Sequence, residues 1–297
     1  MNCFFTSTLC SVIAFSSFAI AQEDSFNPLF NGKDLSGWNS ARSTGEADWG
    51  AFSVNDEENA IHVYAGKEPN SEQPTDYLYT DQQYSHFVWK LEYKWLENRF
   101  KPRPDFDRDS GLLFHVHGDV KRVWPFCLEM QIGESPGDKP DAKGSQGRFH
   151  TGDLFVLRKN LRASVPVGKD WKYNADGKRR SGRNVRTPLG VEKPKGQWNE
   201  IEIRVHGSEK ATFILNGETV LETFDFYYEN EDKATKAKTR VALERGHIGL
   251  QAEWAEILFR NILVKDMSST KMEDAPDKST GENTPSAEAP AAGTGSK

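Results

Sequence analysis

Two polar side chains alternate with apolar ones in the segment from Phe126 to Ile132 and are the first candidates for chemistry. Glu129 and Gln131 are two positions apart, so an extended strand would project both from one face. A carboxylate beside an amide can bind sugar hydroxyls, or act as a general acid or base with a neighbour that orients it. The same pattern is also typical of ordinary polar residues on a solvated sheet face.

The segment from Glu129 to Glu134 reads E-x-Q-x-x-E and is similar to the E-x-D-x-x-E motif of laminarinase-type glycosidases, whose carboxylates act as nucleophile and acid. Here Gln131 occupies the middle position. Strict alternation also sends Glu134 to the opposite face unless a β-bulge intervenes. A conventional two-carboxylate glycosidase is therefore one alternative function.

Two histidines lie two positions apart in the segment from Gly111 to His117. Alternation predicts that His115 and His117 share one strand face with Leu113, while the other apolar residues share the opposite face. On that face His115 could act as a base or contact a substrate, although a histidine in a strand is often structural.

Three aspartates, Asp105, Asp107 and Asp109, have the carboxylate spacing of a calcium loop. The glycine of such a loop comes one position late here, and its last ligand position holds no glutamate. The interleaved arginines favour a turn with local ion pairs. We therefore predict no metal and no cofactor, although a divalent metal is compatible with the chemistry considered below.

The elements that position these side chains are predicted to be β-strands, because period-2 alternation is frequent and helical periodicity is scarce. Alternating segments include residues 111–117, 126–132, 201–205, 248–252 and 257–264. Asn216-Gly217 between two further apolar runs predicts a two-residue hairpin turn. The fold class predicted is all-β, a two-sheet antiparallel sandwich.

Composition excludes some classes of function. The 297 residues contain 38 Lys and Arg against 44 Asp and Glu, and the resulting net charge of −6 argues against a nucleic-acid binder. Eight Trp, eight Tyr and eighteen Phe supply aromatic rings for a core and for stacking on sugars. One stretch is strongly basic: Arg158 to Arg186 contains ten Lys or Arg and two acidic residues. It is predicted to be a loop, which is either a solvated excursion or a lid over a sugar or an anionic group.

Both ends of the chain are predicted to lie outside the folded domain. Residues 1–21 resemble a signal peptide: Leu9 to Ala21 is uncharged, too short to span a membrane, and ends in Ala-Ile-Ala. Residues 268–297 lack aromatic residues and are predicted to be disordered, which leaves 22–267 as the domain. The protein is then exported to the periplasm or beyond, with Cys127 as the one cysteine of the mature chain.

Several motifs taken in order resemble the 3-keto-disaccharide hydrolase domain family, also described as 3-keto-glucoside 1,2-lyase/3-keto-2-hydroxy-glucal hydratase. The matching segments are Leu29-Phe30-Asn31-Gly32-Lys33-Asp34-Leu35-Ser36-Gly37-Trp38, Asp109-Ser110-Gly111 with His115, Trp124-Pro125 with Glu129-x-Gln131, Gly152-Asp153, Gly196-Gln197-Trp198-Asn199, Leu215-Asn216-Gly217 and Gly246 to Glu253 leading into Phe259-Arg260-Asn261-Ile262. They cover almost the whole predicted domain.

The resemblance implies a concanavalin A-like jelly-roll sandwich of the lectin and glucanase type, and a reaction on glycosides oxidised to a ketone at C3. It implies His115 or Glu129 as the base. By position it assigns hydroxyl-orienting roles to Gln131, Asp153 and Glu253. Trp124 and Trp254 are candidate sugar platforms, with core filling as the alternative.

Three functions therefore stay open from the sequence. The first is an enzyme that cleaves 3-keto-glycosides by elimination and hydration. The second is a conventional glycosidase, and the third is a non-catalytic glycan-binding module, since one fold supports many functions. In each case the partner is an oligosaccharide or glycoside, with no nucleic acid and no membrane span expected.

Overall fold

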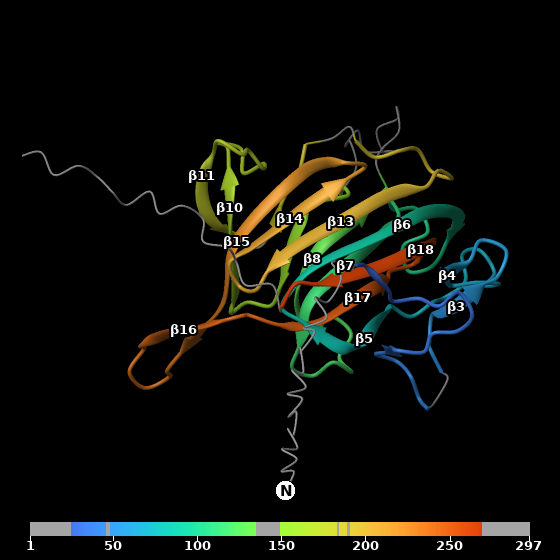
Figure 1. Cartoon of the computed structure of the whole chain (residues 1–297), viewed down its shortest axis with the longest axis horizontal. Coiled ribbons are helices and arrows are strands. Elements are labelled where there is room, and N and C mark those ends of the chain that lie inside the picture. The colour runs from blue at the N-terminus through green and yellow to red at the C-terminus, as the bar shows by residue number, and fades with distance from the viewer. Residues whose placement is uncertain (1–24, 46–47, 135–148, 183, 189–190, 269–297) are drawn as a thin grey trace, which may run out of the picture.

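The computed structural model describes residues 25–45, 48–134, 149–182, 184–188 and 191–268. Within these ranges the chain forms eighteen β-strands and no helix, and the strands build two antiparallel sheets packed face to face (Figure 1). The predicted all-β, two-sheet jelly-roll sandwich is confirmed. The predicted signal peptide and C-terminal tail lie outside the described residues, and no helix in the described part could span a membrane.

The larger sheet has eleven strands. Its main path is β11 (Lys178–Gly182), β10 (Leu161–Val167), β15 (Glu218–Glu231), β14 (Lys210–Leu215), β13 (Asn199–His206), β6 (His86–Arg99), β18 (Ala255–Asp266), β4 (Ala60–Val63) and β3 (Phe52–Asn55). Two strands pair beside this path, β1 (Asn27–Pro28) with β18 and β16 (Lys238–Ala242) with β15. The β15–β16 hairpin extends away from the sandwich (Figure 1).

The smaller sheet has seven strands and carries most of the predicted site residues. Its order is β12 (Asn184–Val185), β9 (Leu154–Leu157), β8 (Phe126–Gly133), β7 (Asp109–His117), β17 (Gly246–Ala252), β5 (Asp76–Tyr84) and β2 (Trp38–Ser40). The three central strands β8, β7 and β17 therefore lie side by side, although β17 comes from a part of the chain far from the other two.

The hydrophobic core lies between the two sheets and follows from alternation in the sequence. Along β6, Phe87, Trp89, Leu91, Tyr93 and Trp95 are all buried, while the residues between them face outward. These large side chains pack against inward residues of the smaller sheet. At about 25 cal/mol per Å² of apolar surface, such burial is the main force that holds two sheets together.

The hairpin prediction at Asn216-Gly217 is confirmed. Both residues have positive φ, 49° and 84°, and they join β14 to β15. The side chain of Asn216 also donates to the backbone oxygen of Val191 at 2.7 Å, which ties the turn to a neighbouring loop.

The prediction of a loop from Arg158 to Arg186 is wrong for much of its length, because β10, β11 and β12 lie within it. The reason is local: Leu161, Ala163 and Val165 alternate with polar residues and are fully buried against the core. Its high content of Lys, Arg and Gly hid this short apolar register.

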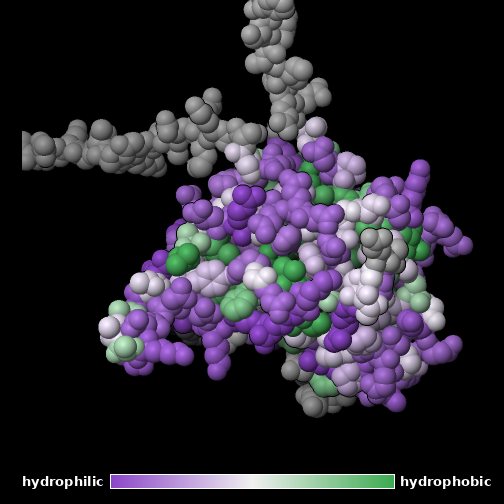
Figure 2. Space-filling model, turned by 90° about the horizontal axis from the view of Figure 1, so that it is seen from below, coloured by the Kyte–Doolittle hydropathy of each residue, from purple (hydrophilic) through white to green (hydrophobic). Residues whose placement is uncertain are grey.

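The surface of the molecule is mainly hydrophilic. Seen from below, apolar residues form small groups near the middle of the face and polar residues surround them (Figure 2).

Candidate active site

Glu129 and Gln131 project from the outer face of the smaller sheet, as alternation predicted. The intervening residues of β8, Leu128, Met130 and Ile132, point into the core between the sheets. Only 3% of Glu129 and 3% of Gln131 is exposed, so the face that they occupy is covered and is not the solvated face considered from the sequence. A buried carboxyl and amide on a sheet face need a structural or chemical reason to be there.

Strand register brings further polar residues to these two. Gln131 lies opposite Gly111 of β7, and the pairing of β7 with β17 continues to an isolated bridge between Asp109 and Glu253. The Gln131 amide donates to the Asp109 carboxylate and, at 2.7 Å, to the backbone oxygen of Ser110. We call Arg103, Asp109, Glu129, Gln131, Gln251 and Glu253 the outer-face cluster.

Gly111 makes room for the carboxyl of Glu129. A Cβ atom at position 111 would lie 2.2 Å from Glu129 Oε1 and 2.8 Å from its carboxyl carbon. Real Cβ atoms do not approach other atoms so closely, so any side chain here would displace Glu129. The glycine of the Asp109-Ser110-Gly111 motif therefore has a direct geometric role in the outer-face cluster.

One cation serves two carboxylates of the outer-face cluster. Arg103 Nη1 lies 2.7 Å from Glu253 Oε1 and 3.6 Å from Asp109 Oδ2. Its guanidinium also lies over the indole of Trp254, 4.5 Å from the ring centre, which fixes its direction. Charge-assisted hydrogen bonds of this kind are shorter and stronger than neutral ones, so Arg103 fixes the position of the Glu253 carboxylate.

Glu129 has the opposite environment. Burial first, and then repulsion by Asp109 and Glu253, raises the pKa of Glu129 well above its ordinary range. The described residues give its carboxyl no hydrogen bond and no ion pair that would oppose this shift. Burial and the two neighbouring carboxylates therefore favour the protonated form of this carboxyl, which is the form that can donate a proton.

Gln251 is the second buried group of the outer-face cluster without a partner. It is 2% exposed, and among the described residues neither its amide nitrogen nor its amide oxygen finds a hydrogen-bond partner. Leaving a buried polar group unpaired costs about 1–3 kcal/mol, so such groups usually meet water or a ligand. Gln251 can both donate to and accept from a hydroxyl group.

A small hollow of about 180 Å³ lies beside Gln251. Its lining residues are Asp76, Tyr77, Leu113, Val123, Trp124 and Gln251. The hollow is too narrow to admit a water-sized sphere, so it holds no sugar ring in this conformation. Trp124, a predicted sugar platform, belongs to its wall.

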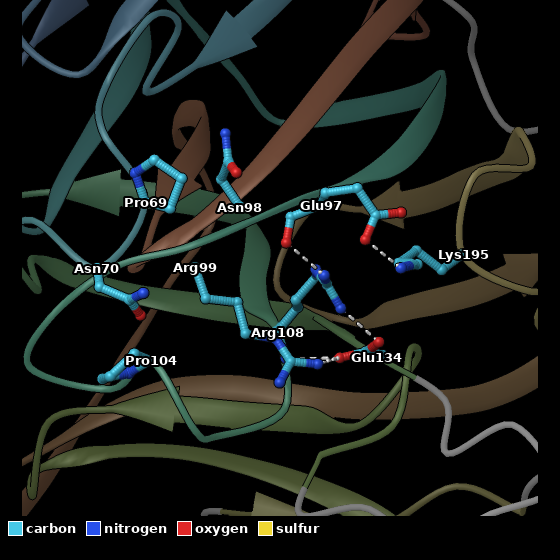
Figure 3. Close-up of a pocket in the computed structure, with 9 residues that line it drawn as sticks. All are labelled: Pro69, Asn70, Glu97, Asn98, Arg99, Pro104, Arg108, Glu134 and Lys195. Carbon is cyan, nitrogen blue, oxygen red and sulfur yellow. Dashed lines mark hydrogen bonds and ion pairs between the residues drawn. The ribbon is translucent and has the colours of Figure 1, made fainter.

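A larger polar groove of about 680 Å³ lies at the end of β6 and β8 (Figure 3). We call it the ion-pair groove, since its charged residues pair with one another: Arg108 with Glu134 at 2.5 Å, Arg99 with Glu134 at 2.7 Å, and Lys195 with Glu97 at 2.5 Å. Glu134 thus faces this groove and not Glu129. The two glutamates of E-x-Q-x-x-E do not form a facing pair on the outer face.

The ion-pair groove and the outer-face cluster are adjacent. Arg103 belongs to the cluster, and the next residue, Pro104, lines the groove. In the same way Arg108 lines the groove and the next residue, Asp109, belongs to the cluster. Because consecutive Cα atoms are about 3.8 Å apart, the loop from 103 to 109 is a shared wall.

The predicted face of His115 is wrong. His115 has a positive φ of 52°, and a register shift between Phe114 and His117 marks a β-bulge there. The bulge turns the imidazole into the core, where it is 0% exposed, packs against Phe87 and Phe226, and bonds through Nε2 to the Gly207 carbonyl at 2.8 Å. Burial lowers the pKa of His115 to about 4, and the residue cannot reach the outer-face cluster.

Asp153 is completely buried, but it lies at a turn and is surrounded by donors. Thr187 N donates to Oδ1 at 2.7 Å, while His150 N and Arg186 Nη1 donate to Oδ2 at 3.0 and 3.1 Å. The hydroxyl of Thr187 donates as well, at 3.1 Å. This geometry gives Asp153 a structural role, which is to hold the 150–153 turn against the segment that follows β12. Its backbone oxygen, not its side chain, contacts Gln131.

The two predicted sugar platforms differ. Trp254 donates its indole N–H to the Gln73 carbonyl at 2.8 Å and carries Arg103 on one face, so that face is already covered. Its evident role is to position Arg103. Trp124 is half-buried in the wall of the small hollow and stays a predicted sugar contact.

Sequence reasoning missed Arg103, Asp109 and Gln251 as members of the site. Gln251 had a usable signal, because it lies two positions before Glu253 in an alternating strand. Asp109 was considered only for calcium. In the described part of the chain no group of three or more His, Cys, Asp or Glu side chains has a metal-ligating arrangement.

A family model described as the 3-keto-alpha-glucoside-1,2-lyase-like domain matches residues 25–265. The chain belongs to this family. Members of the 3-keto-alpha-glucoside-1,2-lyase-like family share the domain that contains the outer-face cluster here. A search of curated proteins gave no significant match.

Solved structures with a similar chain path include two predicted glycosyl hydrolases from Parabacteroides distasonis. The first is 18% identical, with a TM-score of 0.48, and the match covers 81% of this chain and 93% of the other. The second is 20% identical, with a TM-score of 0.44, and the match covers 82% of this chain and 99% of the other. A β-glucanase from Bacillus licheniformis is 10% identical, with a TM-score of 0.38, and the match covers 80% of this chain and 95% of the other.

Proposed function

We propose that this protein is an exported enzyme that cleaves the glycosidic bond of 3-keto-glycosides by elimination and subsequent hydration. Membership of the 3-keto-alpha-glucoside-1,2-lyase-like family supports the substrate class. The observation that carries the proposal is the placement of Glu129. Its carboxyl is buried on the outer face of the smaller sheet, its pKa is raised by burial and by Asp109 and Glu253, and Arg103 holds Glu253 at 2.7 Å.

The chemistry needs an acid and a base with different proton affinities. A ketone at C3 of the sugar acidifies the hydrogen on C2. A base removes that proton, the electron pair forms the C1–C2 double bond, and the glycosidic oxygen departs from C1 with a proton from an acid. Water then adds across the double bond, so that the net change is hydrolysis.

The outer-face cluster supplies this division of roles. Two carboxyl groups whose environments push their proton affinities apart identify acid and base. Glu129 is the acid for the departing oxygen, and Glu253, which is paired with Arg103, is the base at C2. Arg103 also places a positive charge near the developing enolate.

Two amides complete the assignment. Gln251 orients a sugar hydroxyl with its unpaired amide, whereas the Gln131 amide is already committed to Asp109 and acts by positioning that carboxylate. These assignments revise the roles expected from the sequence, in which His115 or Glu129 was the base. The ion-pair groove next to the cluster offers room for the leaving group.

The test compares a 3-keto-disaccharide with its unoxidised parent, incubated with the mature protein and followed by product analysis. We expect turnover of the 3-keto sugar only. Cleavage of both would favour a conventional glycosidase. Binding without any product would favour a glycan-binding module, and either result would overturn the proposal.

A further inference from the structure

The charge of the chain is distributed unevenly. Residues 158 to 186 carry a formal charge of +8, so the rest of the chain carries −14 to reach the total of −6. A local surplus of this size attracts anions even when the whole protein repels them, most strongly within about one Debye length of 8–10 Å.

Most cations in this segment have no acidic partner. In its described part, Arg162 approaches Glu229 at 3.5 Å and Arg186 approaches Asp153 at 3.1 Å. No ion pair forms at the remaining seven Lys and Arg of the described segment, which are Arg158, Lys159, Lys169, Lys172, Lys178, Arg179 and Arg180. Their charge is therefore available to a partner in solution.

Two of these arginines contact aromatic rings, on opposite faces of β11. The guanidinium of Arg179 lies 3.6 Å from the ring centre of Phe224, and that of Arg180 lies 5.3 Å from the ring centre of Trp171. Stacking fixes each guanidinium while leaving the N–H groups at its rim free to bind. Ordered cations lose less entropy when they bind a ligand.

Trp171 is itself an exposed ring, with 46% of its surface accessible. Gly182 lies beside it: a Cβ atom at that position would be 3.7 Å from the Trp171 ring, so the absence of a side chain leaves the edge of the indole open. An open indole next to cations is suited to a ring with apolar C–H faces and acidic substituents.

The position of β11 leaves room for a long ligand. β11 is the terminal strand on the main path of the larger sheet, and within the described residues no strand pairs beyond it. It lies at one end of the sandwich, whereas Glu129 lies on the other sheet (Figure 1). A ligand here would not occupy the outer-face cluster.

We propose that the edge strand β11 binds an acidic polysaccharide that passes around its edge. The binding residues, which we call the β11 surface, are Lys178 and Arg180 with Trp171 on one side of the strand and Arg179 on the other. Carboxylate or sulfate groups of such a polymer would pair with the cations, and one sugar ring would stack on Trp171. The site would hold the protein on an anionic glycan independently of the reaction at Glu129. Nucleic acids also carry repeated anions, and the experiment below separates them from acidic polysaccharides by a direct comparison with single-stranded DNA.

The experiment measures binding of the full mature protein to immobilised polygalacturonate, dextran sulfate and neutral dextran at low and moderate salt. We expect binding to one or both anionic polymers, weakened by added salt, and none to dextran. The variant R179Q/R180Q should bind at least about tenfold more weakly, and W171A about five- to tenfold more weakly, with unchanged melting temperatures. The two anionic polymers distinguish carboxylate from sulfate as the recognised group.

A matched control removes two charges elsewhere. K233Q/K236Q changes two exposed lysines of the turn between β15 and β16 and should leave binding unchanged. Equal losses in R179Q/R180Q and K233Q/K236Q would overturn the proposal, because attraction would then follow net charge alone. Equal affinity for single-stranded DNA, or no binding to either anionic polymer, would also overturn it.

Discussion

Two buried carboxyl groups of this sandwich have opposite surroundings. Asp153 accepts hydrogen bonds from two backbone N–H groups, a hydroxyl and an arginine. Glu129 is buried to a similar extent but lies beside Asp109 and Glu253, with no donor among the described residues. Burial raises the pKa of both, and only at Asp153 do donors oppose that shift.

The difference separates structural from chemical use of the same functional group. A carboxylate whose acceptor sites are filled contributes to stability and has nothing left for a ligand. A carboxyl without donors destabilises the fold, and such groups cluster at functional sites. Position in a family motif did not distinguish the two, whereas their hydrogen-bond partners do.

The sharpest way to break this comparison is the pair of isosteric variants E129Q and D153N. We expect E129Q to lower kcat on a 3-keto-disaccharide about 10³-fold, since a general acid contributes roughly 10²–10⁴-fold. The melting temperature should not fall, because an uncharged amide replaces a carboxyl whose charged form is disfavoured by burial. Retained turnover in E129Q would remove Glu129 from the mechanism.

D153N should show the reverse pattern. The amide N–H₂ of asparagine would face donors that now reach a carboxylate, and we expect a loss of about 3 kcal/mol in the free energy of unfolding. Chemical denaturation measures this loss, and kcat per folded molecule should change little. Unchanged stability together with lost turnover would assign Asp153 to the reaction instead.

The pH dependence of stability gives a third comparison. Because the folded-state pKa of Glu129 is raised above its unfolded value of about 4.3, its contribution to stability is complete below that pH and declines as pH rises toward the folded pKa. The free energy of unfolding of the native protein minus that of E129Q should therefore fall as pH rises above the unfolded pKa, by up to about 1.4 kcal/mol per pH unit. A difference that stays constant with pH would show that Glu129 is already ionised.

The smallest expected effect tests only the structural role of Asp153. T187V removes the hydroxyl that donates to Asp153 at 3.1 Å and keeps the backbone donor. We expect a loss of about 1 kcal/mol in the free energy of unfolding, with kcat and KM unchanged. Urea titration beside a turnover assay measures both, and a change in KM would place Thr187 near the substrate.

Much of the fold could be predicted from the sequence, because alternation along strands such as Asn199–His206 reports directly which face is buried. The shared face of Glu129 and Gln131 followed from the same periodicity. The failures have local causes. A β-bulge at His115 reverses the alternation through a single positive φ at a non-glycine residue, which no pattern of apolar residues encodes.

The remaining site residues depend on contacts between distant segments. Arg103 comes from a loop, and only the folded structure brings it to Glu253, 150 positions later in the chain. Glu129 and Asp153 looked alike as acidic residues in matching motifs. Their hydrogen-bond partners come from other strands and loops, and so their different roles could not be predicted from spacing.

The most direct test of the outer-face cluster is a crystal structure of E129Q with a bound 3-keto-disaccharide. We predict that the oxidised ring contacts positions 129, 251 and 253, with its C2 next to the Glu253 carboxylate and the leaving sugar directed toward the ion-pair groove. A sugar bound elsewhere, with Gln251 still unpaired and no contact to position 129, would contradict the catalytic site described here.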